Sequence, residues 1–138
     1  MGRPDMGWPL RVFSRAVKMH CLVVDDSDVI RRVAKRLLED LNFTSTEAEN
    51  GQEALERCRR AMPDFIMLDW QMPMMMSADF VYLLRKEPGG ETPIIFYCTS
   101  ENDVDDISRA LDAGADDYVL KPFDREDLVA RLTANGLI

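Results

Sequence analysis

The 138-residue chain is poor in the side chains that build disulfide scaffolds and zinc sites, since it has only three cysteines and one histidine. Cys21, Cys58 and Cys98 are odd in number and show no CxxC spacing. This pattern argues against a disulfide framework and against thiolate ligation of zinc. We therefore expect reduced, buried thiols in a cytoplasmic protein, and a structural part for the single histidine, His20.

Long apolar runs and an excess of positive charge are also missing. No segment approaches the roughly 18 apolar residues of a membrane-spanning helix, and basic residues interrupt the segment where a signal peptide needs its apolar core. The formal net charge is -8, and so acidic a chain is repelled by nucleic acid and by anionic membranes. We expect a monomer that binds neither, and whose partners are cations or basic protein surfaces.

The length suits one domain, and the charge divides the chain into two parts. Residues 1–18 carry four basic side chains against one acidic side chain and show no clear apolar period. This composition predicts a flexible, basic N-terminal extension. The alternative is a basic arm that contacts a partner protein or a membrane. The folded domain is expected at residues 19–138.

Strand-like apolar runs alternate with helix-like segments from residue 19 onward. The expected strands are 19–24, 44–48, 64–68, 93–98 and 118–120, and the expected helices are about 29–41, 51–61, 77–86, 101–113 and 124–135. Five short-looped alternations predict an α/β domain, a parallel sheet with helices on both faces. The helical spacing also predicts that the first helix buries one face against the sheet, formed by Val29, Ile30, Val33, Ala34, Leu37, Leu38 and Leu41. The fourth helix is expected to have its apolar residues on one side, namely Val104, Ile107, Ala110 and Leu111.

Polar side chains stand at the ends of four of these strands. Asp25 and Asp26 follow the first strand, Asp69 follows the central strand, Thr99 follows the fourth and Lys121 follows the fifth. The carboxyl ends of parallel strands meet at one edge of the sheet, where open α/β sheets bind their ligands. We therefore expect these five side chains to lie together.

The chemistry of this group points to a cation and to phosphate. Three carboxylates at one edge repel one another unless a cation offsets their charge, and oxygen ligands of this kind suit Mg²⁺, which makes Asp25, Asp26 and Asp69 candidate ligands. A carboxylate beside such an ion, with a hydroxyl and an ammonium group aimed at the same point, can accept a phosphoryl group. Asp69 would be the nucleophile, Thr99 the hydroxyl donor and Lys121 the cation.

Four motifs together resemble the receiver domain of the response regulators of bacterial two-component systems. They are VVDDS at 23–27, MLDWQMP at 67–73, CTS at 98–100 and GADDYVLKPF at 114–123, in the family's order and spacing. The resemblance covers about residues 19–137 and is of the chemotaxis-regulator type. It implies a flavodoxin-like, doubly wound sheet of five parallel strands in the order 2-1-3-4-5, with five helices.

The resemblance also implies an acceptor and a set of metal ligands. Asp69 matches the phosphoacceptor, which takes its phosphoryl group from the phosphohistidine of a sensor histidine kinase. Asp26, Asp69 and the backbone carbonyl of Gln71 match the ligands of Mg²⁺. Asp25 matches the acid that holds the ion through water.

Other matched residues belong to the switch that follows phosphorylation. Thr99 matches the residue that moves toward the phosphoryl oxygens, and Lys121 matches the one that pairs with them. Tyr118 matches an aromatic residue that swings inward when Thr99 shifts. Pro122 matches a proline that follows a cis peptide bond.

Two departures from the family pattern and one cluster of methionines lie near the site. Met76-Ser77 stands where the family often has Asp-Gly, so this loop must reach the next helix without the freedom of glycine. Ser100 replaces the alanine that is common there and is still small. The methionine cluster, Met72 and Met74–Met76, is expected to pack within its loop or to form an adaptable partner surface.

We interpret the chain as a stand-alone receiver that catalyses only its own phosphorylation and dephosphorylation. The segment 101–135 would be its output face, contacting a downstream target or a phosphotransfer protein. With the last helix ending close to Ile138, we expect no DNA-binding or catalytic output domain. A relay intermediate and an unphosphorylated scaffold stay open as alternatives. A Mg²⁺-dependent phosphatase acting through an aspartyl-phosphate fits less well, because it needs a second acid two residues after its nucleophile and a substrate cap.

Overall fold

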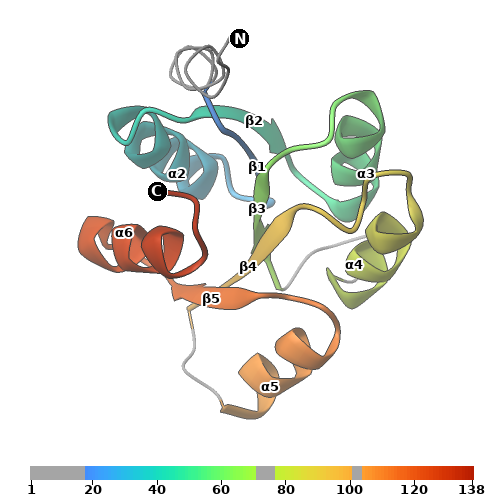
Figure 1. The fold of residues 1–138 in the computed structure, drawn as a ribbon. Helices are drawn as coiled ribbons and strands as arrows, with labels where there is room; N and C mark the ends of the chain where they lie inside the picture. The colour runs from blue at the N-terminus through green and yellow to red at the C-terminus, as the bar shows by residue number, and fades with distance from the viewer. Residues whose placement is uncertain (1–17, 71–76, 101–103) are drawn as a thin grey trace, which may run out of the picture.

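The computed structural model describes residues 18–70, 77–100 and 104–138, in which five strands alternate with five helices (Figure 1). The strands are β1 (His20–Val24), β2 (Thr44–Ala48), β3 (Phe65–Asp69), β4 (Ile94–Thr99) and β5 (Asp117–Leu120). The helices are α2 (Asp28–Asp40), α3 (Gly51–Arg60), α4 (Ser77–Lys86), α5 (Val104–Asp112) and α6 (Arg125–Ala134). Within these ranges no helix is long and apolar enough to cross a membrane.

The five strands form one parallel sheet in the order β2-β1-β3-β4-β5, which confirms the doubly wound α/β fold implied by the resemblance. Strand β3 lies at its centre, and all five of its residues are buried. A strand covered on both faces needs apolar side chains on both, which is why Phe65–Leu68 form an unbroken apolar run.

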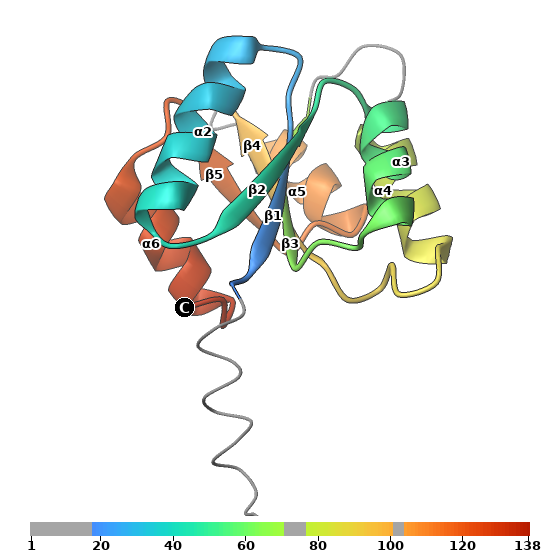
Figure 2. The same ribbon diagram turned by 90° about the horizontal axis from the view of Figure 1, so that it is seen from above.

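Helices cover the sheet in two layers, with α2 and α6 on one face and α3, α4 and α5 on the other (Figure 2). Successive side chains of β3 point to opposite faces. Ile66 and Leu68 therefore join the core beneath α3 and α4, whereas Phe65 and Met67 join the core beneath α2 and α6.

Two helices begin at side-chain caps close to the expected positions. The hydroxyl of Ser27 accepts a hydrogen bond from the backbone of Ile30 at 3.3 Å, and the side chain of Asn50 accepts one from the backbone of Glu53 at 2.8 Å. Such caps satisfy amide groups that the first helical turn leaves without partners. They allow α2 and α3 to start directly after the short loops that follow β1 and β2.

The predicted apolar faces are wrong at four positions. Val29, Val33, Val104 and Leu111 are 63%, 42%, 76% and 43% exposed. In α2, Ala34 and Leu38 of the expected face are buried, together with Arg31, so the buried stripe includes an arginine and leaves out Val29 and Val33. Arg31 can be buried because its guanidinium has hydrogen-bond partners beside the sheet, as described below.

Two adjacent glycines after α4 differ in what a side chain would meet, and they provide a matched test of the fold. A Cβ atom at Gly90 would lie 1.8 Å from the carbonyl oxygen of Leu84, whereas one at Gly89 would have no atom within 4 Å and only a positive φ of 79° to tolerate. We expect Gly90→Ala to lower the free energy of unfolding by about 3 kcal/mol and Gly89→Ala by about 1 kcal/mol. Urea denaturation measures both, and equal losses would contradict the packing around Gly90.

Candidate functional site

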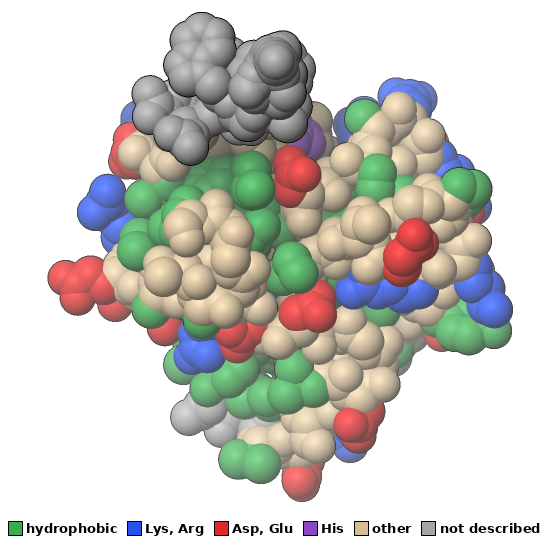
Figure 3. Space-filling model, viewed as in Figure 1, with side chains coloured by type: hydrophobic (Ala, Val, Ile, Leu, Met, Phe, Trp, Pro, Cys, Tyr) green, Lys and Arg blue, Asp and Glu red, His purple; other side chains and the backbone are tan. Residues whose placement is uncertain are grey.

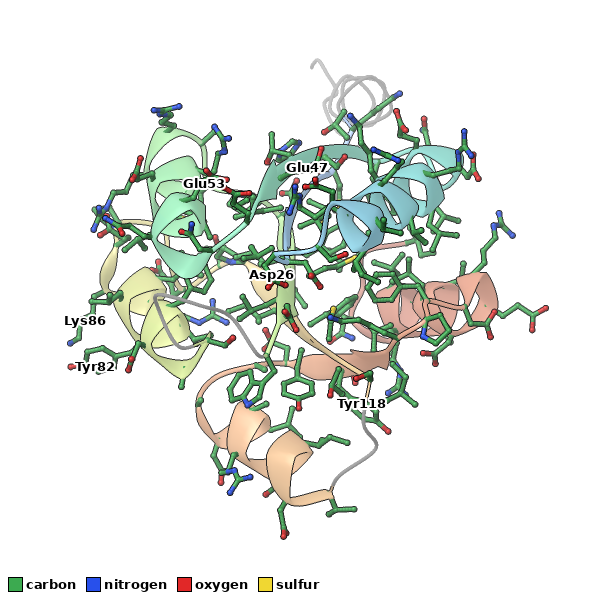
Figure 4. All side chains as sticks on the ribbon, turned by 180° about the vertical axis from the view of Figure 1, so that it is seen from behind. Asp26, Glu47, Glu53, Tyr82, Lys86 and Tyr118 are labelled. Atoms are coloured by element: carbon green, nitrogen blue, oxygen red, sulfur yellow. The ribbon has the colours of Figure 1, made fainter. Side chains whose placement is uncertain are left out.

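The five side chains that the sequence predicts at one sheet edge lie there in the structure. Asp25 and Asp26 follow β1, Asp69 ends β3, Thr99 ends β4 and Lys121 follows β5. All five line a cavity of about 530 Å³. Figure 4 faces this edge, with Asp26 near the centre of the view.

The three carboxylates differ in their exposure to solvent. Asp25 and Asp69 are only 3% and 6% exposed, whereas Asp26 is exposed. One carboxylate oxygen from each can be chosen so that all three lie within 4.8 Å of one another. On the opposite edge, by contrast, acidic and basic side chains are interspersed around the rim (Figure 3).

Lys121 places its ammonium group between the two buried carboxylates. Its Nζ lies 2.8 Å from Oδ2 of Asp25 and 3.1 Å from Oδ1 of Asp69. Burial by itself lowers the pKa of Lys121, but the hydrogen bonds and charges of Asp25 and Asp69 outweigh burial and raise that pKa above its ordinary value. The lysine therefore stays charged and offsets part of the acidic charge of the cavity.

Every polar atom of Asp25 has a partner in the protein. Its backbone N–H donates to the carbonyl of Ala48 at 3.1 Å, and its Oδ1 accepts from the backbone N–H of Ser27 at 2.9 Å. Its Oδ2 accepts from Lys121, and its backbone carbonyl accepts from Nη1 of Arg31 at 2.6 Å. Asp25 is thus held firmly, while no described residue donates a hydrogen bond to the carboxylate of Asp26.

Arg31 is a supporting residue that sequence reasoning missed. Besides the carbonyl of Asp25, its guanidinium contacts Asp28 on α2 and, at 3.0 Å, Oε1 of Glu47 on β2. Its position three residues before Ala34 and seven before Leu38 follows the helical period of the buried face. This spacing was the available signal, but an arginine on a buried face is unusual enough to be set aside.

We expect Arg31→Met to lower the free energy of unfolding by about 2 kcal/mol, because the buried carbonyl of Asp25 then loses its donor. Arg32→Met is the matched control, since Arg32 is the exposed neighbour on the same helix, and it is expected to change that energy by less than about 0.5 kcal/mol. Urea denaturation of both variants measures the difference. Equal effects would mean that the guanidinium does not support β1.

The residues expected to form the switch lie at different places. Thr99 is half-buried in the cavity wall, and Pro122 also lines the cavity, after a cis Lys121–Pro122 peptide bond. Tyr118 lies on β5 outside the cavity lining, below Asp26 in Figure 4, and its ring centre is 4.4 Å from Cζ of Arg131. Gln71 and the methionine cluster fall outside the described residues.

Residues 21–133 match the family model described as the response regulator receiver domain. The chain belongs to this family. Receiver domains are signalling proteins rather than enzymes for a separate substrate, they bind Mg²⁺ in an acidic pocket, and they interact with histidine kinases and phosphotransfer proteins.

Known relatives of this receiver domain include both long and short proteins. The phosphate regulon transcriptional regulatory protein PhoB of Klebsiella pneumoniae is 36% identical over 113 residues, which are 82% of this chain and 49% of PhoB. The chain thus spans about half the length of that regulator. The chemotaxis protein CheY of Pseudomonas aeruginosa is 36% identical over 115 residues, which are 83% of this chain and 93% of CheY.

A solved structure carries the same fold. The chemotaxis response regulator CheY4 of Vibrio cholerae superimposes with a TM-score of 0.80 at 30% sequence identity, and the match covers 86% of this chain and 98% of CheY4. This agreement confirms the flavodoxin-like arrangement of the sheet.

The residues of the cavity fit the magnesium ion that receiver domains bind. The three clustered side chains are carboxylates, and hard oxygen ligands are those that Mg²⁺ takes. A neighbouring sulfur does not compete, because burial raises the pKa of the Cys98 thiol well above its ordinary value and keeps it protonated. Asp25, Asp26 and Asp69 are the acids that could hold the ion, and the carboxylate of Asp26 is the most exposed of the three.

Proposed function

We propose that this protein accepts a phosphoryl group on Asp69 from a sensor histidine kinase, with Mg²⁺ held in the acidic cavity, and thereby changes a protein-binding face. One observation carries the proposal. Asp69 is a nearly buried carboxylate that shares its cavity with Lys121, whose Nζ lies 3.1 Å away, and with two further carboxylates within 4.8 Å. This arrangement has a nucleophile, a fixed cation and a place for a divalent ion.

The chemical step is a displacement at phosphorus. A carboxylate oxygen of Asp69 attacks, a P–O bond forms, and the P–N bond to the kinase histidine breaks; its electron pair stays on the imidazole nitrogen, which is then protonated. Lys121, already beside Asp69, can pair with the phosphoryl oxygens, and the hydroxyl of Thr99 can donate to them. The bound metal supplies positive charge that offsets the charge of these oxygens.

The switch would pass from Thr99 toward α5, β5 and α6. Strand β5 supports this route because it pairs directly with β4. Thr99 lies opposite Leu120, and Tyr118 lies two residues earlier on β5, opposite Tyr97. Two apolar side chains of α5, Val104 and Leu111, are exposed. They are candidates for the face that a target protein or a phosphotransfer protein contacts, by a shift between two conformers.

Several expectations from the sequence stay predictions. They are the flexible basic extension at residues 1–18 preceding a domain at 19–138, the cytoplasmic location, the monomeric state, the absence of nucleic-acid and membrane binding, and the backbone carbonyl of Gln71 as a metal ligand. An effector role and a relay role use the same chemistry at Asp69, so the choice between them depends on the partner.

The test uses purified protein and acetyl phosphate as a small phosphodonor. We expect intact mass spectrometry to reveal one phosphoryl adduct in Mg²⁺ and none in EDTA. An adduct of equal yield in EDTA would remove Mg²⁺ from the proposal. No adduct under either condition would favour the scaffold interpretation over the proposed function.

A further inference from the structure

Ser77, the first residue of α4, is only 1% exposed and uses its hydroxyl at the end of the central strand. The Oγ atom lies 2.6 Å from the backbone carbonyl oxygen of Asp69 and 2.9 Å from that of Trp70. A hydroxyl has one proton to donate, so it is shared between these two carbonyls. The hydroxyl of this first helical residue is thus directed to β3.

This contact completes a set of hydrogen bonds on the peptide that follows Asp69. The N–H of Trp70 donates to the carbonyl of Cys98 at 3.2 Å, while the carbonyl of Asp69 accepts from Ser77 at 2.6 Å. Because a peptide unit is planar, fixing both its N–H and its C=O fixes the rotation of the whole unit. The backbone that carries the Asp69 carboxylate is therefore held on both sides.

Packing alone does not explain why residue 77 is a serine rather than an alanine. An alanine would occupy nearly the same space but would leave two carbonyls at a buried strand end without this donor, and buried carbonyls need donors. The ammonium group of Lys121 does not serve these carbonyls, because it donates to the carboxylates of Asp25 and Asp69. The hydroxyl of Ser77 is thus a donor that contacts both carbonyls at the end of β3.

We propose that Ser77 is a positioning residue for phosphoryl transfer: its hydroxyl sets the orientation of the Asp69–Trp70 peptide and so aims the Asp69 carboxylate at the metal and the phosphodonor. This inference rests on the proposed function. In-line displacement needs the attacking oxygen in a narrow range of positions, so a peptide free to rotate slows the reaction even when the fold is intact.

The first measurement is the rate of adduct formation with acetyl phosphate at saturating Mg²⁺. We expect Ser77→Ala to lower this rate on the order of tenfold, as for loss of a buried hydrogen bond, and Ser77→Thr to stay close to the wild-type rate because it keeps the hydroxyl. Ser77→Cys keeps the volume with a weaker donor and is expected to fall between them. The control is Ile95→Val, which shortens a fully buried side chain of β4 and lowers stability without touching the peptide.

The second measurement is amide hydrogen exchange in the absence of phosphodonor. In Ser77→Ala the amide of Trp70 is expected to exchange faster on the order of tenfold, because its bond to Cys98 opens more often when the opposite side of the peptide is released. The amide of Met67, earlier in β3, should keep its wild-type rate. This readout tests the role of Ser77 whether or not the protein is phosphorylated.

The outcomes separate the two claims. A wild-type protein that takes no phosphoryl group overturns the proposed function and the catalytic part of this inference with it. A wild type that is phosphorylated, with Ser77→Ala equally fast and its Trp70 exchange unchanged, overturns the role of Ser77 alone. Equal slowing in Ser77→Ala and Ile95→Val would show a general loss of stability and would likewise overturn it.

Discussion

Lys121→Met lowers the free energy of unfolding by about 3 kcal/mol in EDTA, because it leaves two buried carboxylates without their common cation. The two acids, Asp25 and Asp69, have side chains that are only 4% and 9% exposed. Their mutual repulsion cannot be screened well by solvent at such burial. Urea denaturation at neutral pH measures this loss.

Added Mg²⁺ is expected to restore part of the stability of Lys121→Met, and to stabilise this variant more than it stabilises the wild type. A divalent ion that binds only the folded state adds stability according to its affinity, and removing Lys121 raises the negative charge that attracts the ion. Urea unfolding of the two proteins at increasing Mg²⁺ concentrations, without calcium, tests this ordering. A larger gain in stability for the wild type would contradict the claim that Lys121 offsets the charge of the acidic cavity.

Lys86→Met is the matched control for charge. The ammonium group of Lys86 lies 4.7 Å from the ring centre of Tyr82 on the surface of α4 (Figure 4), and the loss of such an exposed contact costs less than about 1 kcal/mol. Lys86→Met should also show the magnesium dependence of the wild type. A loss as large as that of Lys121→Met would mean that net charge, rather than the pairing in the cavity, sets the stability.

Neutral pH is the right condition for this comparison. The pKa of Lys121 is raised in the folded protein, so its pairing contributes fully below its unfolded pKa of about 10.4 and is lost only as the pH rises through the higher folded value. The difference between wild type and Lys121→Met should therefore shrink at strongly alkaline pH.

Asp69→Asn abolishes adduct formation with acetyl phosphate, which is the largest effect that we expect on activity. The amide nitrogen and oxygen that replace the carboxylate are poor nucleophiles, and Asp25 does not take over because its carboxylate is engaged by Ser27 and Lys121. The fold should survive, since the amide oxygen still accepts from Lys121. Intact mass spectrometry, with the unfolding midpoint measured in parallel, checks both statements.

Asp112→Asn is the control for this substitution. Asp112 is the exposed last residue of α5. The Asp112→Asn protein should therefore give the same yield of phosphoryl adduct as the wild type. Residual phosphorylation in a folded Asp69→Asn would transfer the acceptor role to another residue.

The convergence of the site was predictable because it follows from topology. Once Asp25, Asp69 and Thr99 are placed at the ends of parallel strands, the in-register sheet brings them to one edge. Strands β1, β3 and β4 were predictable because strands buried on both faces leave continuous apolar runs. The mixed polar character of β2 instead suited the edge of the sheet, where the structure places it.

The supporting contacts were not predictable in this way. Arg31 and Ser77 are polar residues whose burial depends on carbonyl groups that become available only when β1, β3 and the helices are assembled. A pattern of apolar residues carries no information about such partners. It therefore assigned Val29 to the buried face of α2 and left Arg31 out of that face, whereas the structure has them the other way round. Tertiary hydrogen bonding decided these positions.

The most direct test of the central claim is to locate the phosphoryl group. Borohydride reduction of the phosphorylated protein converts an acyl-phosphorylated aspartate to homoserine, which peptide mass spectrometry assigns to one position. We predict homoserine at residue 69, dependent on Mg²⁺ during phosphorylation. Homoserine at residue 25 or 26, or no reduced residue in a phosphorylated sample, would contradict Asp69 as the acceptor.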